Sequence, residues 1–132
     1  MTHADTQREA PITGSTPGGR VALVTGATSG IGRACAIRLA ADGFAVLVGG
    51  RDVERAGAVV DDITAAGGTA TTALGDVADP GYGDAAVAAA LDAFGRLDVL
   101  VNAAGVITRA DAEGTSDAEW HRVMSTNLDG LF

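Results

Sequence analysis

The stretch VTGATSGIG at positions 24–32 places three glycines between an apolar run and a helical pattern. The apolar run, residues 21–25, has the length of a strand, and apolar residues recur at helical spacing after the loop. Gly26 permits a sharp exit from the strand, while Gly30 and Gly32 let backbone amides approach a ligand closely. Because free amides and the positive end of a helix dipole favour anions, this loop predicts a binding site for a diphosphate.

Apolar runs of strand length alternate with helical patterns along the rest of the chain. The expected strands are Val21–Thr25, Phe44–Val48, Thr69–Leu74 and Leu97–Val101. Continuous apolar runs suit parallel strands buried on both faces, and strands that alternate with helices form right-handed crossovers. We therefore expect an α/β fold with a parallel sheet and flanking helices. In such a sheet, ligands bind beyond the carboxyl ends of the strands, where the glycine-rich loop lies.

Capping residues and apolar stripes indicate four helices. Asp52 is expected to cap the second, Asp79-Pro80 to open the third, and Ser116 with Glu119 to form a capping box for the fourth. The apolar stripes are Ile31, Ala34, Cys35 and Leu39 on the first helix, Val87, Leu91 and Phe94 on the third, and Trp120, Met124, Leu128 and Leu131 on the fourth.

The composition suits one small domain. With 132 residues, 47% of them hydrophobic, the chain can bury a core, whereas we expect residues 1–19 to form a flexible polar arm. A net charge of −8, with nine arginines and no lysine, argues against nucleic-acid binding. No apolar run approaches the ~18 residues that span a bilayer, and Cys35 is the only cysteine. We expect a cytoplasmic protein with no metal site and no membrane partner.

The missing lysine disfavours a P-loop, which requires Gly-Lys where this chain has Ile31-Gly32. The stretch TGATSGIG instead resembles the TGxxxGIG motif of the short-chain dehydrogenases/reductases, and three further motifs of that family follow in order. They are Gly75-Asp76-Val77, Asn102-Ala103-Ala104-Gly105 and Ser125-Thr126-Asn127-Leu128. The resemblance runs from about Arg20 to Phe132 and is greatest to the single-domain oxoacyl and polyketide ketoreductases.

This resemblance implies that residues 20–132 are the N-terminal part of a Rossmann-type dinucleotide-binding domain, incomplete at four βα units, with strand order 3-2-1-4. It implies a cofactor site at Gly26, Thr28, Ser29, Gly30, Ile31, Arg51, Asp76, Val77, Asn102, Ala103 and Gly105. A turn or cap role is the competing interpretation for Asp76 and Asn102.

The resemblance also implies that Asn127 belongs to the catalytic tetrad of the family. This residue falls on the apolar stripe of the last helix, between Met124 and Leu128, where a buried amide needs hydrogen-bond partners. A purely structural hydrogen bond is the competing interpretation.

The end of the second expected strand indicates the cofactor. An acidic residue there would bind the ribose 2′-hydroxyl of NAD, whereas an arginine can accommodate the 2′-phosphate of NADP. This chain has Gly50 at the position of the acid, followed by Arg51, so we predict NADP rather than NAD. The competing interpretation is a solvated Arg51 that pairs with Asp52 or Glu54.

The family's reaction is hydride transfer between nicotinamide and a carbonyl or alcohol carbon, and it uses a serine, a tyrosine and a lysine. The only tyrosine, Tyr82, does not start a YxxxK pattern, and we interpret it as a surface residue. We expect the catalytic serine, tyrosine and lysine beyond Phe132, so that these 132 residues alone are inactive. The alternatives are a natural short product that binds a nucleotide or nothing, and another Rossmann protein such as a methyltransferase or a sugar epimerase.

Without later strands, residues 97–101 would form a bare apolar edge of the sheet. We therefore predict poor solubility or self-association for this chain, and a homo-oligomer at full length. The expected partner is a small-molecule carbonyl or alcohol substrate.

Overall fold

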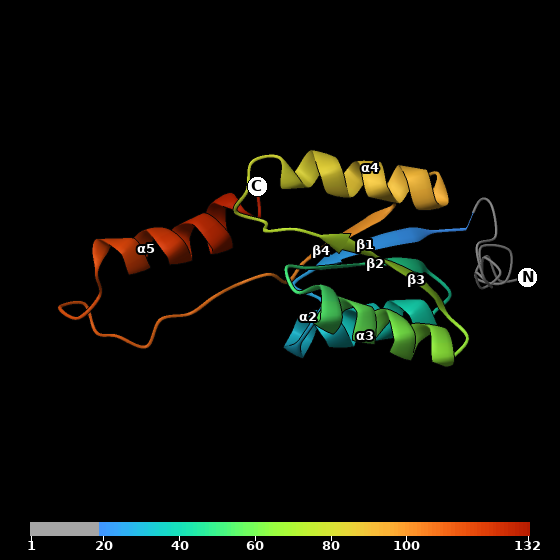
Figure 1. Ribbon diagram of the computed structural model, residues 1–132, viewed down its shortest axis with the longest axis horizontal. Coiled ribbons are helices and arrows are strands. Elements are labelled where there is room, and N and C mark those ends of the chain that lie inside the picture. The colour runs from blue at the N-terminus through green and yellow to red at the C-terminus, as the bar shows by residue number, and fades with distance from the viewer. Residues whose placement is uncertain (1–18) are drawn as a thin grey trace, which may run out of the picture.

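Four parallel strands form the centre of the molecule (Figure 1). The computed structural model describes residues 19–132, so the arm expected over residues 1–19 lies outside the described residues except for Gly19. The strands are β1 (Val21–Thr25), β2 (Ala45–Gly50), β3 (Thr69–Leu74) and β4 (Val99–Asn102). They pair in the order β3-β2-β1-β4, as the resemblance predicts.

Helices cover both faces of the sheet. They are α2 (Gly30–Ala41), α3 (Val53–Ala65), α4 (Tyr82–Phe94) and α5 (Asp117–Met124), which continues as a π-helical segment, η1 (Ser125–Asp129). Figure 1 shows α2 and α3 on one face and α4 on the other, while α5 lies beyond the carboxyl ends of the strands. The predicted Rossmann-type α/β architecture is thus confirmed for the described part of the chain.

Helix α2 packs on the sheet through its smallest residues. Its buried positions are Gly32, Ala36 and Ala40. Ile31 is 80% exposed and Ala34 is also exposed, whereas Cys35 and Leu39 are half-buried at the margin of the core. The predicted stripe is therefore wrong for Ile31 and Ala34, because a face of small residues lets the helix approach the strands more closely than a face of larger ones.

The orientation of α4 differs from the prediction for the same reason. Its buried residues are Tyr82, Ala86 and Ala90. Val87 and Leu91, which we predicted to face the core, are 42% and 50% exposed, and only Phe94 of that stripe packs against the core. The side chains nearest the sheet are again small, apart from the tyrosine at the start of the helix.

Capping residues begin two helices as expected. The Asp52 carboxylate accepts hydrogen bonds from two amides in the first turn of α3, and the Ser116 hydroxyl accepts one from the Glu119 amide at 3.1 Å. The capping box is not completed as predicted, because the Glu119 carboxylate pairs with Arg122 at 3.0 Å. Hydrogen bonding from Arg122 lowers the pKa of Glu119 below its usual value.

Helix α4 begins two residues later than the Asp79-Pro80 pattern predicts. The Asp79 side chain accepts a hydrogen bond from the Gly81 amide at 3.1 Å, and its carbonyl accepts one from the Tyr82 amide at 3.0 Å. These bonds close a turn before the helix, so the proline belongs to the turn rather than to the first helical position.

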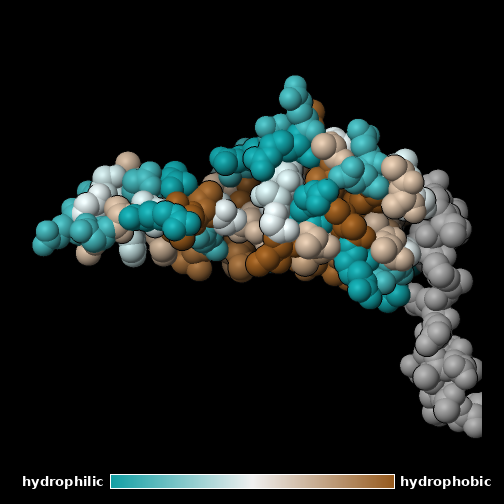
Figure 2. All heavy atoms as spheres, turned by 90° about the horizontal axis from the view of Figure 1, so that it is seen from below, coloured by the Kyte–Doolittle hydropathy of each residue, from teal (hydrophilic) through white to brown (hydrophobic). Residues whose placement is uncertain are grey.

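Strand β4 lies at an edge of the sheet and pairs only with β1 among the described strands. Val99 and Val101 are half-buried, and Leu100 is 52% exposed. Burial of this strand on both faces is therefore wrong for the described part of the chain, where Leu100 presents an apolar side chain at the edge of the sheet. Figure 2 shows the molecule from the side of α2 and α3, with hydrophobic side chains reaching the surface between hydrophilic ones.

Within residues 19–132, no helix has the length and apolar character that crossing a membrane requires.

Candidate functional site

A pocket of about 400 Å³ lies at the carboxyl ends of the strands, the usual place for ligands in parallel α/β sheets. The loop after each of the four strands contributes to its wall. The lining residues are Gly26, Thr28, Ser29, Gly30, Ile31, Gly32, Gly50, Arg51, Arg55, Gly75, Asp76, Val77, Tyr82, Ala103, Ala104, Gly105, Val106 and Thr126. The structure thus brings four separate sequence motifs to one cavity.

Two glycines of the loop after β1 have left-handed backbone angles. Gly26 has a φ of 60°, and a Cβ there would lie 2.6 Å from the Cα of Ala104, so a side chain would push the loop after β4 away. Gly30 has a φ of 55° and no heavy atom within 4 Å of its Cβ position. Glycine is therefore favoured at position 30 by the left-handed backbone angle and not by a lack of space. The space in front of the first turn of α2 remains open.

Gly32 has a packing role in addition to the one expected. It is buried, and a Cβ there would collide with the carbonyl oxygen of Gly26. The absence of a side chain therefore serves the contact between α2 and the loop, and Gly32 also lines the pocket, where it was expected to let backbone amides approach a ligand.

The first turn of α2 fits an anionic group. Ser29 is the N-cap residue, with an extended backbone and no side-chain hydrogen bond to the helix, and the turn carries no acidic residue. The first amides of a helix have no hydrogen-bond partner within the helix. In α2 the Ser29 side chain does not accept a hydrogen bond from them either. With Gly30 and Ile31 in the pocket wall, this arrangement suits the diphosphate of a dinucleotide.

Thr25, which sequence reasoning left without a role, joins the ends of β1 and β4. Its side chain is buried, and its hydroxyl accepts hydrogen bonds from the amides of Ala103 and Ala104, both at 3.2 Å. The same hydroxyl lies 3.5 Å from the carbonyl oxygen of Val101, to which it donates. A hydroxyl residue at the end of a strand, directly before the glycine motif, is the signal that could have identified it.

Tyr82 is a buried residue, so its prediction as a surface residue is wrong. Its side chain is 8% exposed, and its hydroxyl donates a hydrogen bond to the carbonyl oxygen of Ala73 at 2.7 Å. The ring lies against the Cα of Gly75, where a Cβ would collide with it. Burial raises the pKa of the Tyr82 phenol, so at neutral pH it is a protonated donor that forms the floor of the pocket.

Arg51 and Asp76 face each other across the pocket mouth. The Nη1 of Arg51 lies 3.8 Å from the Oδ2 of Asp76, and both side chains remain largely in solvent. The structure pairs Arg51 with Asp76 rather than with Asp52 or Glu54, the partners in the competing interpretation, and the Asp52 carboxylate caps α3. The other oxygen of Asp76 accepts a hydrogen bond from the Ala78 amide at 2.9 Å, so this residue makes the expected turn contact and lines the pocket as well.

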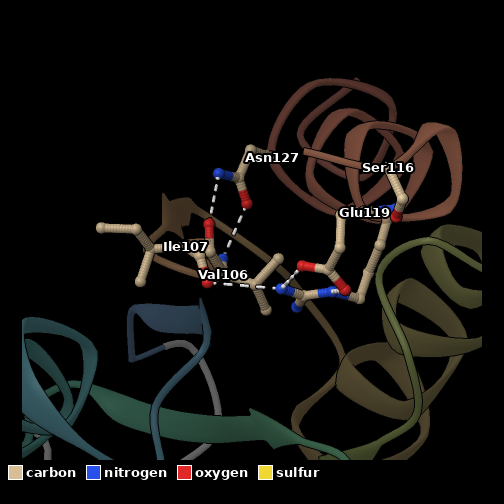
Figure 3. A network of polar contacts seen from close by, with 6 residues as sticks. Val106, Ile107, Ser116, Glu119 and Asn127 are labelled. Carbon is tan, nitrogen blue, oxygen red and sulfur yellow. Dashed lines mark hydrogen bonds and ion pairs between the residues drawn. The ribbon is translucent and has the colours of Figure 1, made fainter. Parts of the chain in front are cut away.

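Asn127 is bonded twice to one residue of the loop after β4 (Figure 3). Its Oδ1 accepts a hydrogen bond from the Val106 amide and its Nδ2 donates one to the Val106 carbonyl, both at 2.8 Å. The side chain is exposed rather than buried on an apolar stripe, because α5 has no buried residue and Leu128 is 56% exposed. The structural hydrogen bond that we considered as the competing interpretation is therefore present.

The predicted cofactor residues converge with one exception. Ten of them line the pocket, whereas Asn102 is exposed at the end of β4 and is not part of the wall. Asn127 lies beside the wall, with its Oδ1 3.5 Å from the Cβ position of Gly105. Sequence reasoning missed Arg55, Tyr82 and Val106 as wall residues. Ala104 and Thr126 lie within motifs that the sequence analysis quotes, but they were not assigned to the cofactor site.

Comparison with known sequences agrees with this geometry. A family model described as short chain dehydrogenase matches residues 20–132. A subunit of (2S)-[(R)-hydroxy(phenyl)methyl]succinyl-CoA dehydrogenase from Thauera aromatica is 39% identical over 86% of this chain and 46% of its own length. The short-chain reductase protein NovJ from Streptomyces niveus is 47% identical over 83% of this chain and 42% of its own. The chain therefore spans about half the length of these relatives.

Solved structures show the same likeness. A dehydrogenase/reductase from Sinorhizobium meliloti superposes with a TM-score of 0.82 at 40% identity, over 91% of this chain and 48% of the other. A variant of actinorhodin polyketide ketoreductase, solved with NADPH, superposes with a TM-score of 0.84 at 39% identity, over 89% of this chain and 45% of the other.

Proposed function

Because the chain belongs to the short-chain dehydrogenase family of oxidoreductases, we propose that its pocket binds NADP(H) for hydride transfer to or from a carbonyl or alcohol substrate. The observation that carries the proposal is the convergence of four strand-end loops on the uncapped first turn of α2. The nicotinamide ring would supply the hydride. The residues of this chain would bind the nucleotide, orient it and hold the loop after β4 in place.

Each part of the pocket matches one part of the cofactor chemically. The first turn of α2, with Ser29, Gly30 and Ile31, would hold the diphosphate. Asp76 and Val77 would contact the adenine, since a carboxylate accepts hydrogen bonds from an exocyclic amino group. The loop from Ala103 to Gly105, fixed by the Thr25 hydroxyl, would border the nicotinamide ribose.

The preference for NADP rests on charge at the end of β2. Arg51 and Arg55 both line the pocket, and Gly50 supplies no carboxylate to repel a phosphate. A guanidinium binds phosphate through charge-assisted hydrogen bonds, which are stronger than those between neutral groups. The solved ketoreductase with NADPH is consistent with this preference.

Catalytic turnover would require groups that these 132 residues lack. The sequence contains no lysine, and its one tyrosine, Tyr82, is buried with its hydroxyl proton donated to a backbone carbonyl. We assign Asn127 a positioning role, through Val106, in the catalytic tetrad that the family resemblance implies. This chain alone is thus expected to bind the cofactor without reducing a ketone at an enzymatic rate.

Fluorescence titration with NADPH and NADH tests the proposal. We expect NADPH to bind more tightly, and Arg51→Ala to weaken NADPH binding about tenfold while leaving NADH binding nearly unchanged. Arg38→Ala is the matched control, because it removes the same charge from an exposed arginine of α2. Arg38 pairs with Asp42 and does not line the pocket. Tighter binding of NADH than of NADPH to the unsubstituted protein would show that the proposed preference is wrong.

A further inference from the structure

Two side chains of the last helix bind consecutive residues of the loop after β4. In η1, Asn127 binds the amide and the carbonyl of Val106, both at 2.8 Å (Figure 3). In α5, the Nη2 of Arg122 donates a hydrogen bond to the carbonyl of Ile107 at 3.3 Å. Residues 103–111 form neither helix nor strand, so the backbone groups of this loop depend on side chains or solvent for their hydrogen bonds.

The π-helical segment turns these two side chains toward the same loop. Arg122 and Asn127 are five residues apart, and five residues of a regular α-helix rotate by about 500°, which would leave the two side chains about 140° apart. In a π-turn the hydrogen bonds run from residue i to residue i+5, which adds one residue to the turn. Such a bond joins the Gly130 amide to the Ser125 carbonyl at 2.9 Å. The added residue brings Asn127 back to the side of Arg122.

Glu119 holds the guanidinium of Arg122 in place. The Nε of Arg122 donates to one carboxylate oxygen at 3.2 Å, and its Nη2 donates to the other at 3.0 Å. Because Nη2 carries two hydrogens, it can also bind the Ile107 carbonyl. Hydrogen bonding from Arg122 is the main cause that lowers the pKa of the Glu119 carboxyl, and hydrogen bonding from Thr108 contributes. An exposed ion pair by itself stabilises little, so the contacts with two loop residues distinguish this pair.

The part of this loop that lines the pocket is fixed at both of its ends. Residues 103–106 belong to the pocket wall. The Thr25 hydroxyl accepts hydrogen bonds from the first two amides of this segment, and the contacts with α5 and η1 hold its last residue and the residue after it. Among the described residues, the wall does not include Arg122 or Glu119. Any effect of this pair on a bound ligand therefore acts through the loop.

We propose that Arg122 and Glu119 are positioning residues, which hold the loop after β4 where it can border the nicotinamide half of the cofactor. Arg122 acts through the Ile107 carbonyl, and Glu119 acts by orienting the Arg122 guanidinium. This inference rests on the proposed function and deepens it, because it makes one wall of the pocket depend on two residues outside that wall. The adenosine half of the cofactor would contact the loops after β2 and β3, so its binding should not depend on this pair.

Hydrogen exchange without cofactor tests whether the pair holds the loop. Arg122→Met keeps the length and helix propensity of the side chain but removes its charge and its donors, so exchange of the Val106 amide should become about fivefold faster. Arg122→Lys keeps a charged donor and should restore most of the protection. Arg38→Met is the matched control, because Arg38 is an exposed arginine of α2 that pairs with Asp42. Unchanged exchange at Val106 in Arg122→Met would overturn the proposal.

Calorimetric titration with two ligands tests the consequence for binding. NADPH contains the nicotinamide half, whereas adenosine 2′,5′-bisphosphate lacks it. Arg122→Met should weaken NADPH binding about fivefold and leave binding of the bisphosphate unchanged, while Arg122→Lys should bind both ligands nearly as the unsubstituted protein does. Glu119→Gln keeps the size of the side chain but removes its charge, so it should weaken NADPH binding about twofold. Equal weakening of both ligands by Arg122→Met would overturn the proposal, because a general loss of structure would have that effect.

The outcomes separate this inference from the proposed function. If the unsubstituted protein prefers NADPH, but Arg122→Met binds NADPH equally well, only the positioning role is wrong. If the unsubstituted protein binds NADH more tightly than NADPH, the proposed preference is wrong, whereas Arg122→Met should still weaken NADH binding about fivefold, because both cofactors share the nicotinamide half. If the unsubstituted protein binds neither dinucleotide, both proposals fail.

Discussion

Tyr82 illustrates how one side chain constrains residues that are distant in the sequence. Its ring occupies the space of a Cβ at Gly75, and its hydroxyl lies 2.9 Å from the Cβ position of Gly49. The ends of β2 and β3 therefore have glycines beside the same ring. Tyr82, which the sequence suggests is an isolated surface residue, thus packs beneath the ends of two strands and lines the cofactor pocket.

We predict that Tyr82→Phe lowers the free energy of unfolding at neutral pH by about 1 kcal/mol, because the Ala73 carbonyl loses its donor. Burial raises the pKa of this phenol above its ordinary value of 10.0, so the folded protein holds the proton more tightly than the unfolded chain. The contribution of the protonated Tyr82 phenol to the free energy of unfolding is fully present below about pH 10. It is lost as the pH rises through the pKa of the folded state. Urea unfolding at increasing alkaline pH should show this loss in the unsubstituted protein but not in Tyr82→Phe.

The near-ultraviolet absorbance of the phenolate provides an independent check. Tyr82 is the only tyrosine of the chain, so the absorbance change reports this residue alone. A phenol that titrates at its ordinary pKa in the folded protein would contradict the prediction.

At the scale of elements, α5 is held mainly by polar contacts rather than by a core. None of its residues is buried, and Trp120 is 58% exposed. Besides the two bonds between Asn127 and Val106 (Figure 3), the guanidinium of Arg122 donates to the carbonyl of Ile107 at 3.3 Å. The loop after β4 and this helix are therefore coupled, which lets α5 influence the wall of the pocket. A π-helical segment places Asn127 at this contact, a feature frequent at functional sites.

We predict that Asn127→Ala increases the hydrogen-exchange rate of the Val106 amide about tenfold, because the opening of this loop no longer breaks two hydrogen bonds. Ser116→Ala is the control, since it removes the cap at the other end of α5 without touching Val106. Residue-resolved exchange measured by NMR distinguishes the two variants. Unchanged exchange at Val106 in Asn127→Ala would show that these bonds do not hold the loop.

At the scale of the whole molecule, apolar surface remains on and near one edge of the sheet. Leu100 of β4 is 52% exposed, and Val87 and Leu91 of α4 are also exposed. An edge strand presents unpaired backbone groups, and an apolar edge favours pairing with another chain. The net charge of −8 opposes such association but does not cover the edge.

We predict that the 132-residue chain by itself self-associates with increasing concentration, and that Leu100→Glu weakens this association about tenfold by placing a charge on the edge. Val53→Glu is the matched control, because it converts another exposed apolar residue, at the start of α3, with the same change of charge. Sedimentation velocity over a range of concentrations measures the effect. A monodisperse monomer of the unsubstituted protein would count against the prediction.

The sequence by itself determined the features that depend on local chemistry. The alternation of apolar runs and helical patterns predicted the parallel α/β order, Asp52 and Ser116 marked two helix starts, and VTGATSGIG located the pocket. These features depend on backbone hydrogen bonds and conformations within a few residues, so short patterns record them.

Only the tertiary structure decided which surfaces meet. Apolar spacing assigned Val87 to the core, but packing density placed Ala86 there, and Tyr82 was buried by strands far from it in sequence. The contact of Thr28 with Gly50 joins two loops that no local pattern connects. The physical reason is that close packing selects complementary shapes between distant segments, and a glycine that accommodates a neighbour looks the same in sequence as one that forms a turn.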